Sequence, residues 1–191
     1  MILLVLVGLS AELTAGVGSS APNRATEYGY KTWFNFFIQA STLKLPWAVE
    51  PYLRFQHQDH PEILGTENLN GVETGVSLKQ IMDFYELGLD VAVFQRYPMF
   101  VVLSLGTGGY YCTSEKQVYG SQTQVITQVS PGLASGLRLE YRRDYHPWLD
   151  DKKVTMLVGL TSAFRYVNFR PDVWPLPDWF ADVGAQVGVR W

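Results

Sequence analysis

Three histidines are the side chains of this sequence best suited to acid–base or metal chemistry. His57 and His60 flank Asp59 in the stretch HQDHP, and His146 stands in DYHPW. Two imidazoles and a carboxylate can bind a divalent metal or take a proton from a substrate, provided that they converge on one open position. A short polar stretch does not provide that convergence. The sequence therefore predicts solvated or structural roles for these residues, with no metal site and no cofactor.

The chain contains one cysteine, Cys112. A single cysteine excludes an intrachain disulfide and a zinc site built from several cysteines. No histidine stands near it in a catalytic spacing, so a buried and inert thiol is the interpretation. Because no set of catalytic residues is recognised, the sequence favours a non-catalytic protein.

Charged residues occur singly within stretches that are otherwise rich in Gly, Ala, Ser and Thr. Small residues with sparse charges of both signs are typical of a narrow lumen, where opposite charges pair because water is scarce. An eight-stranded barrel has an interior just wide enough for side chains, so the predicted role is structural. The residues predicted to form this lumen charge network are Glu50, Arg54, Glu73, Lys79, Glu86, Asp90, Arg138, Glu140, Arg165 and Arg190.

The elements that position these residues are strands, because apolar and polar residues alternate with period two after residue 25. About eight segments alternate, and their length of roughly ten residues matches a tilted strand that crosses a bilayer. The expected strands cover residues 28–39, 47–57, 71–81, 84–95, 99–112, 133–143, 153–167 and 182–191. The predicted fold class is all-β: a closed, antiparallel, up-and-down transmembrane barrel.

The apolar faces of these strands carry Leu, Val and Met in the middle and aromatic residues towards the ends. Aromatic residues make up 14% of the chain and charged residues only 17%, against about 25% charged residues in soluble domains. A lipid-facing band between two aromatic girdles has this pattern, and an open sheet edge would leave backbone groups unpaired in lipid. The predicted girdle residues are Trp47, Tyr85, Tyr141, Phe164, Tyr166 and Trp191.

The formal net charge is −3 and no basic block occurs, which excludes a nucleic-acid footprint. The N-terminal run MILLVLVGL has the length of a signal-peptide core, although no basic residue precedes it. Residues 1–20 are predicted to be a signal peptide, or else to contribute an extra strand over 5–17, and residues 26–191 to be the barrel. Connections 113–130 and 167–181 are expected outside, whereas 58–70 and 80–83 do not fit the rule of short periplasmic turns.

The final stretch, DVGAQVGVRW, places Val183, Ala185, Val187, Val189 and Trp191 on one face. With the alternating strands before it, this stretch resembles the small bacterial outer-membrane β-barrel families, such as the OmpA-like and OmpX-like barrels. The resemblance implies location in the outer membrane, contact with its lipid and lipopolysaccharide, and a C-terminal signal read by the barrel-assembly machinery.

A weaker similarity is to the lipid A deacylase barrels, through LSLGTGGYY and SPGLASGLRLEY. That family uses His and Ser two residues apart on a late strand, and no such pair occurs here, so its catalytic pattern is not carried over.

The prediction is thus an integral outer-membrane barrel with a structural, adhesive or loop-mediated binding role. A lipid-modifying hydrolase of the outer membrane and a soluble lipocalin-like barrel, with apolar faces turned inward around a ligand, are the alternatives. The sequence does not indicate the ligand or the oligomeric state.

Overall fold

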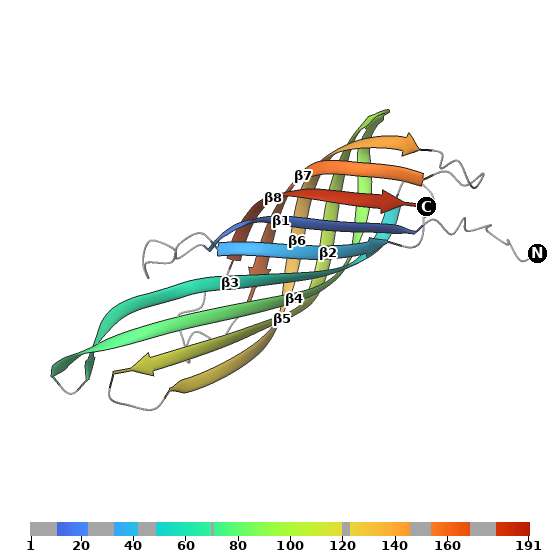
Figure 1. The fold of residues 1–191 in the computed structure, drawn as a ribbon. Coiled ribbons are helices and arrows are strands. Elements are labelled where there is room, and N and C mark those ends of the chain that lie inside the picture. The colour runs from blue at the N-terminus through green and yellow to red at the C-terminus, as the bar shows by residue number, and fades with distance from the viewer. Residues whose placement is uncertain are drawn as a thin grey trace, which may run out of the picture.

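A computed structural model describes residues 11–22, 33–41, 49–69, 71–119, 123–145, 154–168 and 179–191. Every regular element among them is a strand, and none of these residues form a helix long and apolar enough to cross a membrane. The strands are β1 (Glu12–Pro22), β2 (Trp33–Ser41), β3 (Val49–Leu69), β4 (Val72–Arg96), β5 (Met99–Val118), β6 (Gln124–Tyr145), β7 (Val154–Val167) and β8 (Trp179–Arg190). They form a closed antiparallel barrel in sequence order, which confirms the predicted fold class (Figure 1).

The barrel closes where β8 pairs with β1. The register of this seam runs from Glu12 opposite Arg190 to Pro22 opposite Phe180. Main-chain hydrogen bonds between Ala11 and Trp191, at 3.0 and 3.1 Å, continue it by one residue. Closure pairs the backbone all the way round, as a barrel in hydrocarbon requires.

One expected strand boundary is wrong. Residues 71–81 and 84–95, predicted as two strands, form the single strand β4. The intervening residues 80–83, QIMD, contain no Gly or Pro, so the chain has no turn residue at which to reverse. The eighth strand is β1, which begins within residues 1–20, the range predicted as signal peptide or extra strand, and ends at Pro22; residues 1–10 lie outside the described residues.

The two ends of the barrel differ. Ala11, Trp191 and the tight turn at 97–98 lie at one end, called here the termini end; the β3–β4 and β5–β6 connections lie at the other, called the hairpin end (Figure 1). Because 80–83 is part of β4 and 58–69 is part of β3, these two ranges are not connections at all. The apparent exceptions to the loop rule in this half of the chain therefore do not exist.

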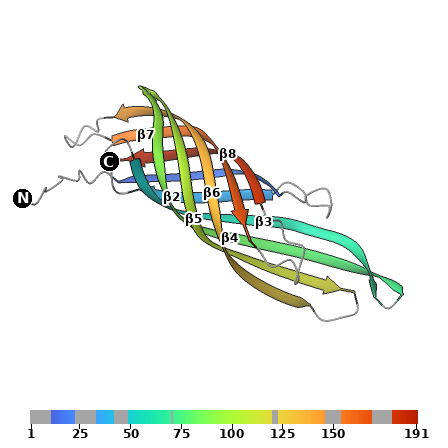
Figure 2. The same cartoon turned by 180° about the vertical axis from the view of Figure 1, so that it is seen from behind.

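Four strands are much longer than the others. β3 to β6 have 20 to 25 residues, whereas the other four have 9 to 14. Their excess length projects from the hairpin end, where they remain paired with one another up to Leu69 opposite Val72 and Lys116 opposite Gln124 (Figure 2). This protruding sheet is defined here as residues 61–69, 72–80, 113–118 and 124–131.

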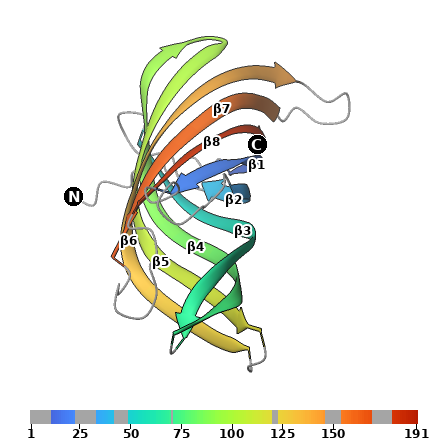
Figure 3. The ribbon, with the colours of Figure 1, turned by 90° about the vertical axis from the view of Figure 1, so that its left-hand side faces the viewer.

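Side chains alternate across the barrel wall, and their polarity is the reverse of that in a soluble protein. Leu160 and Val183 point outward and are 62% and 66% exposed, whereas Arg138 and Glu140 are buried inside. The apolar residues cover the outer wall of the steeply tilted strands seen in Figure 3. Lipid stabilises such a surface and water does not, so the barrel spans a membrane. A lipocalin-like barrel, whose apolar residues face inward, is not what the chain forms.

Candidate functional site

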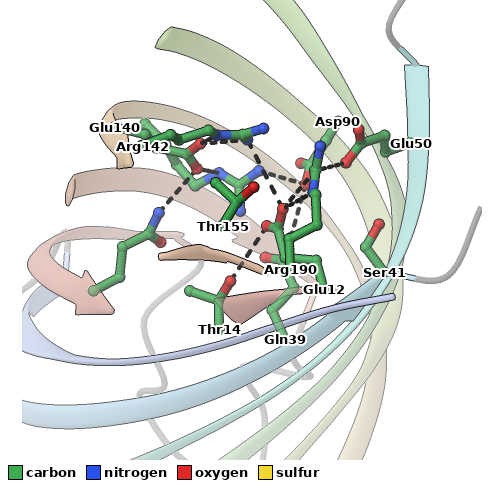
Figure 4. A network of polar contacts seen from close by, with 12 residues as sticks. Glu12, Thr14, Gln39, Ser41, Glu50, Asp90, Glu140, Arg142, Thr155 and Arg190 are labelled. Atoms are coloured by element: carbon green, nitrogen blue, oxygen red, sulfur yellow. Dashed lines mark hydrogen bonds and ion pairs between the residues drawn. The ribbon is translucent and has the colours of Figure 1, made fainter. Parts of the chain in front are cut away.

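The lumen is filled by side chains, and the layer nearest the termini end is ionic. This termini-end network consists of Glu12, Glu50, Asp90, Arg138, Glu140, Arg142 and Arg190 (Figure 4). Arg190 from β8 bridges Glu12 of β1 and Glu50 of β3. Arg190 thereby links β8 and β1, the two strands of the seam, to β3. The network therefore links strands on several sides of the barrel.

Asp90 and Glu140 are the acceptors at the centre of this network. Asp90 accepts from the Arg138 guanidinium at 2.6 Å, from the Gln39 amide at 2.7 Å and from the Ser104 hydroxyl at 2.6 Å. Glu140 accepts from Arg142 at 2.5 and 2.8 Å and from Gln186 at 3.0 Å. Amide and hydroxyl groups thus donate to the carboxylate oxygens in addition to the arginines. A protein interior tolerates buried charges when such additional hydrogen bonds are present.

A second layer, the central network, lies further towards the hairpin end. Arg165 is fully buried and pairs with Glu86 on one side and Asp182 on the other. The Tyr110 hydroxyl donates to Glu86 at 3.3 Å, and the Gln56 amide donates to Asp182 at 3.1 Å. Arg165 is thus the one cation that these two carboxylates share among the described ion pairs.

Arg54 belongs to the same layer but is held differently. Its guanidinium carbon lies 4.4 Å from the centroid of the Phe37 ring and 6.0 Å from that of Tyr52. The charge is therefore stabilised in part by the faces of aromatic rings. Cation–π stacking lets the guanidinium fill part of the lumen in this layer.

Aromatic rings also fill the lumen. Phe84, Tyr110 and Phe180 are fully buried, with ring centroids 4.8 Å apart for Phe84–Tyr110 and 5.8 Å apart for Phe84–Phe180. The lumen contains a 270 Å³ cavity at the termini end, and a space beside Arg54 measures 10 Å³. The lumen around Arg54 is therefore closely packed.

Glycines make room for these rings. A Cβ at Gly88 would collide with the carbonyl oxygen of Leu105 and with the ring and hydroxyl of Tyr52. Gly109, in contrast, has open space where its Cβ would be. The phenol of Tyr52 can therefore lie over the adjacent strand β4 only because Gly88 has no side chain.

We expect Gly88→Ala to lower the free energy of unfolding by about 1–3 kcal/mol, the usual range for overpacking. Equilibrium urea unfolding in lipid vesicles measures the change. Gly109→Ala is the matched control and should leave stability close to that of the wild type. Equal effects of the two substitutions would show that Tyr52 does not fill the lumen as described.

The positions of the predicted lumen residues can now be stated. Eight of the ten lie inside the barrel: Glu50, Arg54, Glu86, Asp90, Arg138, Glu140, Arg165 and Arg190. Glu73 and Lys79 do not; both are exposed on the outer face of the protruding sheet. Their prediction was wrong because continuous β4 sends even-numbered residues inward and odd-numbered ones outward.

Three charged lumen residues escaped sequence reasoning: Glu12, Arg142 and Asp182. Arg142 and Asp182 follow the alternation of Glu140 and Arg190 on their own strands, so continuing the inward face by one step would have found them. Glu12 was hidden because its segment was interpreted as a signal peptide. The sequence holds no independent signal that pairs it with Arg190.

Aromatic residues form a row on the outer wall. Across β2 to β5, ring centroids lie 6.2 Å apart for Phe36–Phe55, 5.2 Å for Phe55–Tyr85 and 5.8 Å for Tyr85–Tyr111. Phe164 and Trp179 form a second contact at 5.3 Å on β7 and β8. The predicted residues Tyr85, Phe164, Tyr166, Tyr141 and Trp191 are all exposed, and Trp47 lies outside the described residues.

The histidines of HQDHP point to opposite sides of the wall. His57 faces outward, with its Nδ1 atom 2.7 Å from a carboxylate oxygen of Asp83 and its ring against Phe36. His60 is buried on the inner side, and Asp59 is exposed. These residues therefore do not converge, and no group of His, Cys, Asp and Glu among the described residues could hold a metal. His146 lies outside the described residues.

The remaining singled-out residues have simple surroundings. Cys112 is buried in the lumen, with its sulfur 3.7 Å from the Ser114 hydroxyl. The C-terminal residues Val183, Val187, Val189 and Trp191 expose 39–66% of their surface outward, and Ala185 is exposed beside them. The apolar face of β8 is thus part of the outer wall.

No protein-family model matches this sequence, and no curated protein matches it. The structure is similar to that of Ail, the attachment invasion locus protein of Yersinia pestis, with a TM-score of 0.57 and 10% sequence identity over 96% of this chain and 99% of Ail. A second Ail structure, in complex with the heparin analogue sucrose octasulfate, gives a TM-score of 0.54 and 11% identity over the same shares. A major outer membrane protein from Thermus thermophilus gives 0.49 and 11%, over 95% of this chain and 99% of that one. The chain therefore has the fold of the small outer-membrane β-barrels, as its resemblance to them implied.

Proposed function

We propose that this protein is an integral outer-membrane barrel that does not conduct ions and acts at the cell surface through its protruding sheet. One observation carries the proposal: the lumen is filled with paired charges and rings, while the four strands β3 to β6 extend together beyond the barrel at the hairpin end. A sealed barrel leaves the projecting end as the part able to meet a partner. In this proposal the hairpin end faces outward and the termini end faces the periplasm.

The side chains on the outer wall of the barrel are suited to contact with membrane lipid. Leu, Val and Met side chains cover the barrel portion, and the aromatic row lies at its hairpin-end side. Tyr and Trp suit the boundary between hydrocarbon and headgroups, since one end is apolar and the other forms hydrogen bonds. We assign this boundary to the outer leaflet with its lipopolysaccharide, and the exposed apolar face of β8 with Trp191 to recognition by the barrel-assembly machinery.

The alternative of a lipid-modifying hydrolase has less support. Such an enzyme needs a nucleophile within hydrogen-bond reach of its base. The described polar contact of His57 is with Asp83 on the outer wall, whereas His60 is on the inner side. The two imidazoles are thus separated by the barrel wall, so they cannot serve one site.

Conductance in planar lipid bilayers tests the sealed barrel. We expect the purified protein to insert without producing discrete current steps, since the central network and the ring layer block the lumen. A 16-stranded porin in the same bilayer is the positive control for detection. Reproducible steps from the wild-type protein would contradict the proposal.

A further inference from the structure

The protruding sheet has two unpaired edges among the described residues. β2 pairs with β3 only as far as Asp59, and β7 pairs with β6 only as far as Gly132. Beyond these points β3 and β6 each have one described neighbour, on the side facing the other strands of the sheet. Unpaired strand edges carry free main-chain donors and acceptors and are templates for another strand.

The β3 edge is protected by its sequence. Pro61 has no N–H group, and the register of β3 shifts between His60 and Ile63. The exposed Glu62 adds charge to the same stretch. Proline, bulges and charges are the devices by which natural sheets prevent edge-to-edge pairing. This edge is thus a poor template.

The β6 edge lacks all of these devices over residues 124–130. The stretch QVITQVS has no charge, no proline and four β-branched residues, and its register with β5 is unbroken. Val125 and Val129 are 59% and 57% exposed. The hydroxyl of Ser130 donates to the carbonyl of Asn168, the residue after β7, at 2.6 Å. The open part of the edge is Val125–Val129.

The direction of the main chain identifies the groups on this edge. The Arg142 N–H donates to the carbonyl of Pro98, on the β5 side. Since these groups alternate along a strand, even-numbered residues of β6 bond towards β5 and odd-numbered residues bond away from it. Val125, Thr127 and Val129 therefore direct their N–H and C=O groups to the open side.

We propose that this edge pairs with the same edge of a second copy of the chain, antiparallel and centred on Thr127. Val125 then lies opposite Val129 of the second copy, Thr127 lies opposite its counterpart, and each of these pairs can exchange both main-chain hydrogen bonds. Val–Val and Thr–Thr are favourable cross-strand pairs. The absence of charge removes the repulsion that two identical edges would otherwise meet.

The orientation of this contact follows from the direction of β6. The strand runs from the hairpin end back towards the barrel, so an antiparallel partner has its barrel on the opposite side (Figure 1). The pairing thus joins molecules in two facing membranes. The contact is short and belongs to the weak, transient class of interfaces, so many copies must act together. The inference rests on the proposed function, because it requires the hairpin end to project from the membrane.

Disulfide trapping tests the pairing. The chain has one cysteine, Cys112, and it is buried, so Thr127→Cys introduces an accessible thiol at the proposed centre. Under mild oxidation of the protein in micelles, we expect covalent dimers to form several-fold faster than with Thr66→Cys. Thr66 is the matched control because it is exposed on β3 of the same protruding sheet. Equal rates for the two variants would overturn the proposal.

Two further readouts separate the remaining outcomes. Proteoliposomes of the wild-type protein should cluster, measured by turbidity, and Thr127→Lys should abolish clustering while Thr66→Lys leaves it unchanged. Dimers in micelles without vesicle clustering would overturn the facing-membrane arrangement. If the Thr127→Cys thiol resists a water-soluble maleimide, another part of the protein covers the edge and the proposal fails. Conductance of the same vesicles reports separately on the sealed barrel.

Discussion

Replacing Arg165 by Met is expected to cost about 3–5 kcal/mol of folding free energy, the usual penalty for removing one partner of a buried ion pair. Arg165 is the described cation between Glu86 and Asp182, and all three side chains lie inside the lumen. The substitution keeps much of the volume but leaves two carboxylates uncompensated. Urea unfolding in lipid vesicles, followed by tryptophan fluorescence, measures the loss.

Two further variants isolate the charge. Arg143→Met makes the same change on an exposed, outward position of β6 and should alter stability little. Arg165→Met combined with Glu86→Gln and Asp182→Asn removes all three charges, and most of the stability should return. An Arg165→Met protein as stable as the wild type would mean that the central network does not hold the barrel together.

The second large effect is expected on the outer wall. Leu160→Arg should cost about 2–4 kcal/mol, since a charge on the lipid face near mid-strand must enter hydrocarbon. Leu160 is 62% exposed, and Leu64 on the protruding sheet is 70% exposed. Leu64→Arg is therefore a matched control that should be almost neutral, because its side chain meets water.

This pair of variants distinguishes lipid from water at the outer wall. In a water-soluble barrel both leucines would be equally hydrated, and both substitutions would be tolerated. Urea titration of the vesicle-inserted variants gives the two free energies. A neutral Leu160→Arg would contradict the membrane-spanning barrel.

Alternation was sufficient to predict the barrel and most of its lumen. Wherever a strand is regular, as in β6 and β8, period two assigns Arg138, Glu140 and Arg190 to the inner face. The same rule failed at Glu73 and Lys79 because the length of β4 was misjudged. A break between strands is marked only by turn residues, and the absence of Gly and Pro in QIMD was the signal that mattered.

Partners across the lumen could not be predicted from the sequence. Arg165 and Glu86 are 79 residues apart, and nothing in their local sequence indicates that they meet. The fit of Tyr52 against Gly88 also depends on register and barrel diameter, which one sequence does not specify. Periodicity thus predicts which face a residue occupies, while its contacts follow from closure.

The seam between β1 and β8 has a consequence for folding kinetics. It joins Glu12 to Arg190, which are 178 positions apart, whereas every other neighbouring pair of strands is consecutive in the chain. Contacts of such high sequence separation form slowly, because the entropy of closing a long loop is lost before any bond repays it. We expect the seam to form last, after β1 to β8 have assembled as an open sheet. Until then the edges of β1 and β8 are open to aggregation, so the chain depends on protection during the slow phase.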